Sequence, residues 1–151
     1  MKRHPALYTL SHDHHQGLIL AQQLKKGAPQ YKGMPSTIEG KKEFTISFYN
    51  TGLIKHFKDE EEILFPMSSG KNASIDKLIA EIVNEHRKLE ALIEEIRTTA
   101  ELERVMDELG HLLEKHIRKE ERELFVMIEE ALNENDLDLL SAKLKQTEKT
   151  N

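Results

Sequence analysis

Apolar residues recur at steps of three and four along most of the chain, and this spacing places them on one face of an α-helix. The pattern is most regular between residues 75 and 96, where isoleucine and leucine are mixed with charged residues. The segments between the periodic stretches carry the glycine, proline and asparagine residues that interrupt helices. Four long helices are therefore predicted: from Ser11, or as early as Pro5, to Lys26; from Ser36 to about Leu64; from Asn72 or Ser74 to Thr98; and from Glu101 to about Leu132.

A shorter fifth helix is predicted from Asp136 to about Lys145, followed by a polar, frayed end. Long helices with one apolar face each, joined by short loops, favour an up-down-up-down arrangement around a common core. The expected fold class is all-α: an up-down-up-down four-helix bundle with a short C-terminal tail helix. Because 151 residues is a typical length for one domain, we expect a single domain over residues 1–151, with the bundle at about 7–132 and the tail at 136–151.

The composition limits the chemistry that this core can carry. The chain has no cysteine but eight histidines, so any metal ion must be bound by nitrogen and oxygen rather than by thiolate. The formal net charge of -5 disfavours nucleic acids and anionic membranes as partners. No stretch approaches the roughly 18 consecutive apolar residues of a membrane helix, and no apolar signal region follows the basic start. We expect a cytoplasmic protein that binds neither nucleic acid nor membrane.

Each predicted long helix carries a histidine among the apolar positions of its stripe. Two of the helices add a glutamate four residues after the histidine, one turn along on the same face. An unpaired polar group in an apolar core costs about 1–3 kcal/mol, so mutual hydrogen bonds, buried water or a metal ion must satisfy these side chains. The inward set is His14, His56, Glu60, His86, His116 and Glu120.

Some positions of this set have a close competitor. His15 directly follows His14, and a one-residue change in helix phase would exchange the two. A second glutamate also follows each favoured one, as Glu61 and Glu121. The fourth residue after each histidine is preferred because it stays on the stripe. The remaining acidic residues of these two runs are expected to be partly solvated.

The inward set as a whole favours a metal site. A single histidine on an apolar face is more often a hydrogen-bonded core residue than a ligand. If all four inward histidines were such core residues, their presence on four different helices would be a coincidence. Imidazole and carboxylate ligands suit iron, zinc, manganese or copper. Glutamates on two different helices can each bridge two ions, which favours a dinuclear site. The ferritin-like pattern needs the motif Glu-x-x-His on two helices. This motif occurs once, at Glu108–His111, so the ferritin-like pattern is not met.

The segments around the two His–Glu pairs echo each other. HFKDEEEILFP at 56–66 and HIRKEERELFV at 116–126 both read His-x-x-x-Glu-Glu-x-x-Leu-Phe. Together with LSHDHHQGL at 10–18 and NEHRKLE at 84–90, they resemble the hemerythrin-like (HHE cation-binding) family over nearly the whole chain. This resemblance implies a non-haem di-iron centre in the bundle core, with two iron ions and a bridging oxo or hydroxo group. The ligands that it implies are His14, His56, Glu60, His86, His116 and Glu120, with the two glutamates as bridges.

The third helix departs from the family pattern. Oxygen-carrying hemerythrins have His-x-x-x-His there, whereas this chain has His86 followed by Glu90. Glu90, a water molecule or His15 could take the place of the missing ligand. The resemblance therefore favours a protein that binds O2 or a related small ligand such as NO, for oxygen or redox sensing, storage or iron handling, over an oxygen carrier.

Two other classes remain open at this point. One is a di-iron enzyme that acts on peroxide or nitric oxide or repairs iron centres, and the other is a metal-free helical interaction module. The sequence does not decide whether the protein is an enzyme, although a binding role is favoured. It also leaves the oligomeric state open.

Overall fold

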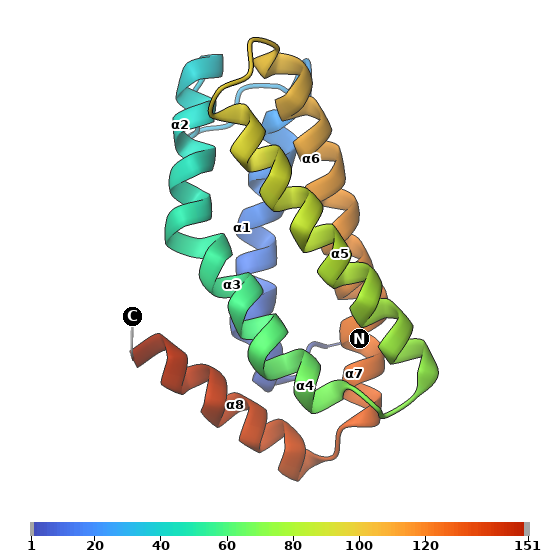
Figure 1. Cartoon of the computed structure of the whole chain (residues 1–151). Coiled ribbons are helices and arrows are strands. Elements are labelled where there is room, and N and C mark those ends of the chain that lie inside the picture. The colour runs from blue at the N-terminus through green and yellow to red at the C-terminus, as the bar shows by residue number, and fades with distance from the viewer. Residues whose placement is uncertain (1, 150–151) are drawn as a thin grey trace.

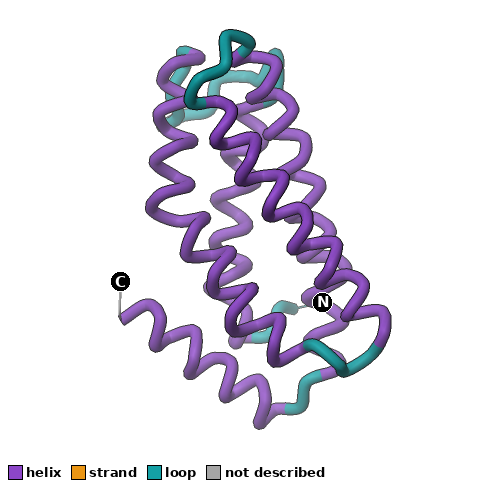
Figure 2. Tube along the Cα trace, viewed as in Figure 1, coloured by secondary structure: helices purple, strands orange, loops and turns teal. Residues whose placement is uncertain are grey.

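The computed structural model describes residues 2–149, and every regular element in this range is helical (Figures 1 and 2). Four long segments run up, down, up and down, and a last helix crosses one end of the bundle (Figure 1). In chain order the elements are η1 (Pro5–Leu7) and α1 (Tyr8–Leu24); α2 (Ile38–Phe48), η2 (Tyr49–Leu53), α3 (Ile54–Asp59), η3 (Glu60–Leu64) and α4 (Phe65–Ser68); α5 (Ala73–Ile96); α6 (Leu102–Lys119), η4 (Glu120–Leu124) and α7 (Phe125–Ala131); and α8 (Glu134–Lys149).

The predicted fold class is confirmed, and the helix starts follow local capping chemistry. Asn72 caps α5 by accepting a hydrogen bond from the backbone N–H of Ile75, and Thr37, one residue after the expected Ser36, caps α2 in the same way. The first helix begins at Pro5, in a 3-10 turn, rather than at Ser11. It ends at Leu24, two residues earlier than expected, because Lys25 is already extended.

The second bundle helix ends later than expected. The dipeptide Phe65-Pro66 predicts an end at about Leu64, but the helix continues through α4 to Ser68. The preceding turn, η3, is a π-helix in which the Phe65 N–H bonds to the Glu60 carbonyl five residues back. Because this wider turn has already left the α-helical hydrogen-bond pattern, the ring and the missing N–H of Pro66 disturb the helix less than they would in a regular turn.

The C-terminal helix is longer than the sequence predicts. It begins at Glu134 rather than Asp136 and continues to Lys149, so residues 146–149 are helical rather than frayed, while residues 150–151 lie outside the described range. Its buried leucines join the same core cluster as η1, α4 and α7: Leu137, Leu140 and Leu144. This packing holds α8 across the end of the bundle (Figure 1).

The apolar core consists of two clusters, one towards each end of the bundle. One includes Leu10, Leu64, Ile82 and Leu124, and the other includes Leu20, Leu53, Leu89 and Leu113. On each of the four long segments the inward histidine falls between a member of one cluster and a member of the other. The polar residues of the predicted stripes therefore form a layer inside the bundle, enclosed by apolar side chains on both sides.

Helices α1 and α6 approach each other most closely through small residues. A Cβ atom added at Gly110 would lie 2.7 Å from the Ala21 carbonyl oxygen, and one at Gly17 would lie 2.8 Å from a methyl carbon of Ile117. The Ala21 carbonyl belongs to the backbone, so glycine at position 110 is required for the observed spacing of the helices. The Ile117 methyl is the end of a flexible side chain, which can shift to admit a Cβ at position 17. This close packing brings the histidine of α1 towards the ligand-bearing face of α6 and η4.

Candidate metal centre

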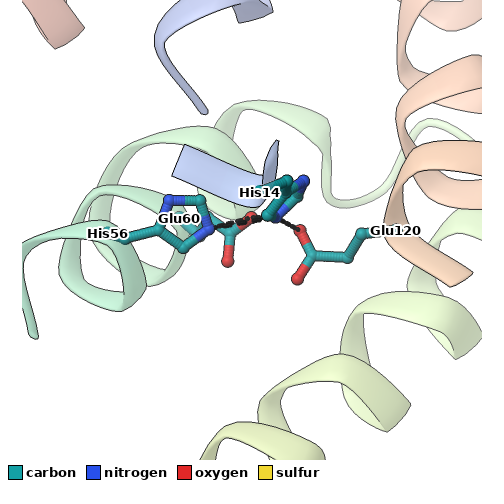
Figure 3. Close-up of side chains that lie close together, drawn as sticks. All are labelled: His14, His56, Glu60 and Glu120. Carbon is teal, nitrogen blue, oxygen red and sulfur yellow. Dashed lines mark hydrogen bonds and ion pairs between the residues drawn. The ribbon is translucent and has the colours of Figure 1, made fainter. Parts of the chain in front are cut away.

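All six side chains of the inward set meet in the polar layer of the bundle. None of them is more than 3% exposed. They come from four helices, and Figure 3 shows four of them converging from α1, α3, η3 and η4. The six residues are His14, His56, Glu60, His86, His116 and Glu120.

The donor atoms form two groups that share one carboxylate. Within each group, every residue offers an atom that lies within 4.8 Å of the others. The Nε2 atoms of His14 and His56 are 3.1 Å apart, and the rings of His86 and His116 have their centroids 5.0 Å apart. The first group is His14, His56, Glu60 and Glu120, and the second is His86, His116 and Glu120.

Each of the two glutamates presents one oxygen to each histidine pair. The Oε2 atom of Glu60 is 3.4 Å from His56 Nε2, whereas its Oε1 atom is 3.1 Å from His86 Nε2. The Oε2 atom of Glu120 is 3.5 Å from His14 Nε2, and its Oε1 atom is 2.8 Å from His116 Nε2. A carboxylate that bridges two cations needs this division of its oxygens between two sets of ligands.

Both bridging candidates begin a π-helical turn. The N–H of Phe65 bonds to the Glu60 carbonyl, and the N–H of Phe125 bonds to the Glu120 carbonyl, five residues back in each case. A step of four residues overshoots one α-helical turn by about 40°, so a stripe spaced by four would leave the core in a regular helix. The wider turns keep Leu64 and Leu124, four residues further on, fully buried. π-turns inside α-helices often mark functional sites.

A second set of carboxylates, which the sequence reasoning did not find, surrounds the histidines. The outward Nδ1 atom of each histidine lies at hydrogen-bond distance from an acidic side chain, and because a carboxylate can only accept, the imidazole donates. Such partners fix the tautomer and the orientation of a metal-ligating histidine. The pairs are His14 with Glu121 at 2.6 Å, His56 with Asp13 at 2.9 Å, His86 with Glu61 at 2.6 Å, and His116 with Glu85 at 2.8 Å.

These outer carboxylates reveal an internal symmetry of the centre. Glu61 and Glu121 each directly follow a bridging candidate, and Asp13 and Glu85 each directly precede a histidine. The doubled glutamates and the two acid–histidine dipeptides were therefore visible in the sequence. The sequence predicts partly solvated side chains for Glu61 and Glu121 and assigns no role to Asp13 or Glu85, because the histidine partners of all four lie on other helices.

Aromatic side chains enclose the histidine rings. The ring of Phe125 stacks on His14 at a centroid distance of 5.2 Å, and Phe57 stacks on His86 at 4.0 Å. Phe65, the counterpart of Phe125 in the sequence echo, lies parallel to His86 at 6.3 Å. These rings keep water away from the Nε2 atoms and strengthen the electrostatic interactions among the buried groups.

The charges of the centre depend on each other. Burial opposes protonation of His14, but the carboxylates of Glu120 and Glu121 outweigh it and raise the pKa of His14 to about 9. The pKa of His86 rises to about 10, because hydrogen bonds and charges of Glu120 and Glu60 outweigh its burial. The pKa values of His56 and His116 are raised in the same manner. The buried carboxylates therefore favour positive charge on the histidine side of the centre.

The residues of this centre fit a pair of cations. When Nδ1 carries the single proton of each neutral imidazole, the Nε2 atoms of His86 and His116 and both carboxylate oxygens of Glu60 and Glu120 face one another as acceptors. These buried atoms then have no hydrogen-bond partner among the described residues. Each such group costs about 1–3 kcal/mol, and this cost is removed if the atoms coordinate metal ions. The donors are imidazole nitrogens and carboxylate oxygens, which suit iron, zinc, manganese or copper.

The two less certain ligand candidates lie outside the centre. His15 is exposed and lines a surface groove with Tyr31 and Arg118. The side chain of Glu90 is 30% exposed and pairs with Arg87 at 3.3 Å. Neither belongs to the two groups of donor atoms found among residues 2–149. The third bundle helix therefore contributes one inward nitrogen, from His86, to the centre.

Fold and site together define a helical bundle with a buried cluster of histidines and carboxylates that could hold metal ions. The model of the hemerythrin HHE cation-binding domain matches residues 7–128, and the chain belongs to this family, as its motifs predict. No curated protein and no solved structure matches the chain. Helix α8 lies beyond the matched residues. Within the described range, no helix has the length and apolar character needed to cross a membrane.

Proposed function

We propose that this protein is a non-haem di-iron protein that binds O2 or a related small ligand such as NO. One iron would be held by His14 and His56 and the other by His86 and His116. Glu120 belongs to both groups, and Glu60 reaches the second through its Oε1 atom, 3.1 Å from His86 Nε2, so both glutamates would be shared. The observation that supports this proposal best is the pair of buried carboxylates whose oxygens have no hydrogen-bond partner and divide between the two histidine pairs. A pair of iron ions supplies redox chemistry and coordination positions that the protein leaves open.

The surrounding residues favour sensing, storage or iron handling. The outer carboxylates bring negative charge to all four histidines. Together with the inward Glu60 and Glu120 they make six acidic groups around the proposed iron ions. Negative charge close to a metal stabilises its higher oxidation state. Since Glu90 and His15 do not reach the centre, the histidine-rich ligand set of an oxygen carrier is not assembled. This favours a centre that responds to oxidants or NO over one that carries oxygen.

We also propose that the whole chain forms one domain of this kind. The support is the packing of α8, whose buried leucines share a cluster with residues of α4 and α7. Each of the two apolar clusters also contains residues of all four long segments, which supports a single domain.

The metal content of purified protein tests the di-iron proposal. We expect protein expressed with iron and purified in air to contain two iron ions per chain and to show a broad near-UV absorption band. The variant His56→Ala should lose at least one ion, because it removes an inward nitrogen, whereas His15→Ala should keep both. Iron-free wild-type protein, or equal iron in both variants, would contradict the proposal.

Addition of small ligands to the reduced, iron-loaded protein separates binding from turnover. We expect O2 or NO to cause a spectral change that saturates at a fixed number of ligands per chain. Continued consumption of NO or peroxide in the presence of a reductant would instead show an enzyme. A metal-free interaction module would give neither response, and chelators would leave its thermal stability unchanged.

A further inference from the structure

Arg3 connects the N-terminal segment to the metal centre from outside the bundle. Its side chain is only 19% exposed. One guanidinium nitrogen donates to Oε1 of Glu129 at 2.7 Å, and the other donates to the backbone carbonyl of Glu121 at 2.7 Å and to its carboxylate at 3.3 Å. These contacts span more than 110 residues of sequence, and they fix the arginine against η4 and α7.

The first route from Arg3 to the centre passes through a carboxylate. Glu121 accepts hydrogen bonds from His14 Nδ1 and from the Ser11 hydroxyl in addition to Arg3. The positive charge of Arg3 therefore helps to hold this carboxylate in the position from which it orients the His14 ring.

A second, independent route passes through an aromatic ring. The guanidinium carbon of Arg3 lies 5.5 Å from the centroid of Phe125, within the range of a cation–π contact. The ring of His14 also stacks on this phenylalanine, with a centroid distance of 5.2 Å and an interplanar angle of 25°. Arg3 therefore contacts both groups that restrain the His14 imidazole, its hydrogen-bond acceptor and its stacking partner.

The backbone contact of Arg3 reaches the π-turn that carries a bridging candidate. The Glu121 carbonyl belongs to η4, the turn in which the Phe125 N–H bonds to the Glu120 carbonyl instead of to the Glu121 carbonyl. Arg3 donates to this Glu121 carbonyl. The guanidinium thus replaces the Phe125 N–H as the donor to the Glu121 carbonyl. It thereby stabilises the turn that presents Glu120 to the core.

The other half of the centre is held by other cations: Lys119 donates to Glu85, the partner of His116, at 2.7 Å. Its corresponding carboxylate, Glu61, pairs with Arg87, which is 54% exposed and otherwise pairs with Glu90 on its own helix. We propose that Arg3 is a positioning residue of the metal centre: it fixes the His14 ring and the η4 turn, and so strengthens metal binding in the half that contains His14. This inference rests on the proposed function, namely that the centre holds cations.

Variants of Arg3 test the assignment through two measurements: the affinity for metal and the behaviour of the His14 imidazole. Arg3→Met keeps the apolar stem, Arg3→Lys keeps the charge, and Arg104→Met is the control, since Arg104 also pairs with several acids but lies on the exposed surface of α6. Co(II) is titrated into each protein in competition with a chelator. We expect Arg3→Met to bind one of its two ions about tenfold more weakly, the smaller of the usual effects of removing an outer partner.

The His14 imidazole is followed in parallel by NMR of the metal-free, ¹⁵N-histidine-labelled protein. We expect the Nδ1 proton of His14 to exchange faster with water in Arg3→Met, with Arg3→Lys between this variant and the wild type, and Arg104→Met like the wild type. Wild-type affinity for both ions in Arg3→Met, or a weaker affinity with an unchanged His14 signal, would overturn the inference. If the wild type binds fewer than two Co(II) ions, the proposed function fails instead, and the NMR comparison still decides whether Arg3 orders the ring.

Discussion

At the scale of single residues, each histidine of the centre uses its two ring nitrogens for different tasks. Nε2 faces the shared carboxylates, while Nδ1 donates to an acidic side chain of a neighbouring helix. The acidic partner decides which nitrogen is free to bind a cation, and it adds negative charge one step away from that cation. The doubled glutamates of the two echoing segments thus combine two roles: the first faces the core and the second orients a histidine.

A charge-neutral substitution at Glu61 tests this second role. Glu61→Gln preserves the shape and one acceptor oxygen, but it removes the charge that His86 and Arg87 share. We expect metal affinity to fall about 10- to 100-fold, as is usual for partners of metal-ligating histidines. The measurement is a competition titration with a chelator.

The next residue provides a matched control for Glu61. Glu62 carries the same charge in the same acidic run, but it is exposed, so Glu62→Gln should bind metal like the wild type. If both variants bind metal equally well, Glu61 has no role in orienting His86.

At the scale of the helices, two features of backbone geometry place the ligands. The π-turns η3 and η4 keep four-residue stripes on the core side of their helices. The close approach of α1 and α6 at Gly110, against the backbone of Ala21, then sets the distance between the first and fourth bundle helices. Both features leave little trace in hydrophobic periodicity, which depends on side-chain character and not on backbone hydrogen bonding.

Substitution of Gly110 by alanine tests the importance of the helix contact. Alanine favours a helix over glycine by about 1 kcal/mol, but its Cβ would lie 2.7 Å from the Ala21 carbonyl oxygen. We expect the clash to outweigh the propensity and the free energy of unfolding to fall by about 1–3 kcal/mol, the usual cost of overpacking. Urea unfolding of the metal-free protein measures it.

A substitution at a second glycine of the bundle separates the effect of helix propensity on stability from the effect of helix packing. A Cβ at Gly52 in η2 would meet no atom within 4 Å, so Gly52→Ala should stabilise the protein by about 0.5–1 kcal/mol. A Gly110→Ala variant that is as stable as Gly52→Ala would show that α1 and α6 can separate at no cost.

At the scale of the whole molecule, the buried charges make folding stability and metal binding respond to pH in opposite directions. In the metal-free protein the carboxylates raise the histidine pKa values, to about 9 for His14 and about 10 for His86, from 6.5. The folded state thus binds these protons more tightly than the unfolded chain does. The resulting stabilisation is complete below pH 6.5 and is lost as the pH rises through the folded pKa values.

The free energy of unfolding of the metal-free protein should therefore fall between pH 6.5 and about 10, by about 1.4 kcal/mol per pH unit for each histidine that is still protonated. Urea midpoints measured with a chelator present provide the test. Metal affinity should increase as the pH rises over the same range, because the histidines must lose a proton before they can bind metal. A metal-free stability that is flat or rises with pH would contradict the arrangement of buried charges.

The sequence by itself determined the helices and the inward set of the centre. Helical periodicity is a local property, so the stripes that contain His56 and Glu60, or His116 and Glu120, could be read without knowledge of any neighbour. The same reasoning could not exclude His15, because helix phase is uncertain by about one residue, or Glu90, because it stands where the family pattern has a second histidine. It also ended the second helix too early, at about Leu64.

Only the tertiary structure decided which groups act together around that set. The outer carboxylates and their histidines are separated by 25 to 107 residues, and Arg3 contacts residues still farther away along the chain. Hydrogen bonds of this kind depend on how the helices pack against one another. The π-turns depend on backbone hydrogen bonds that side-chain patterns do not report. The candidate ligands were thus encoded locally, whereas their orientation and charge balance arose from contacts between helices.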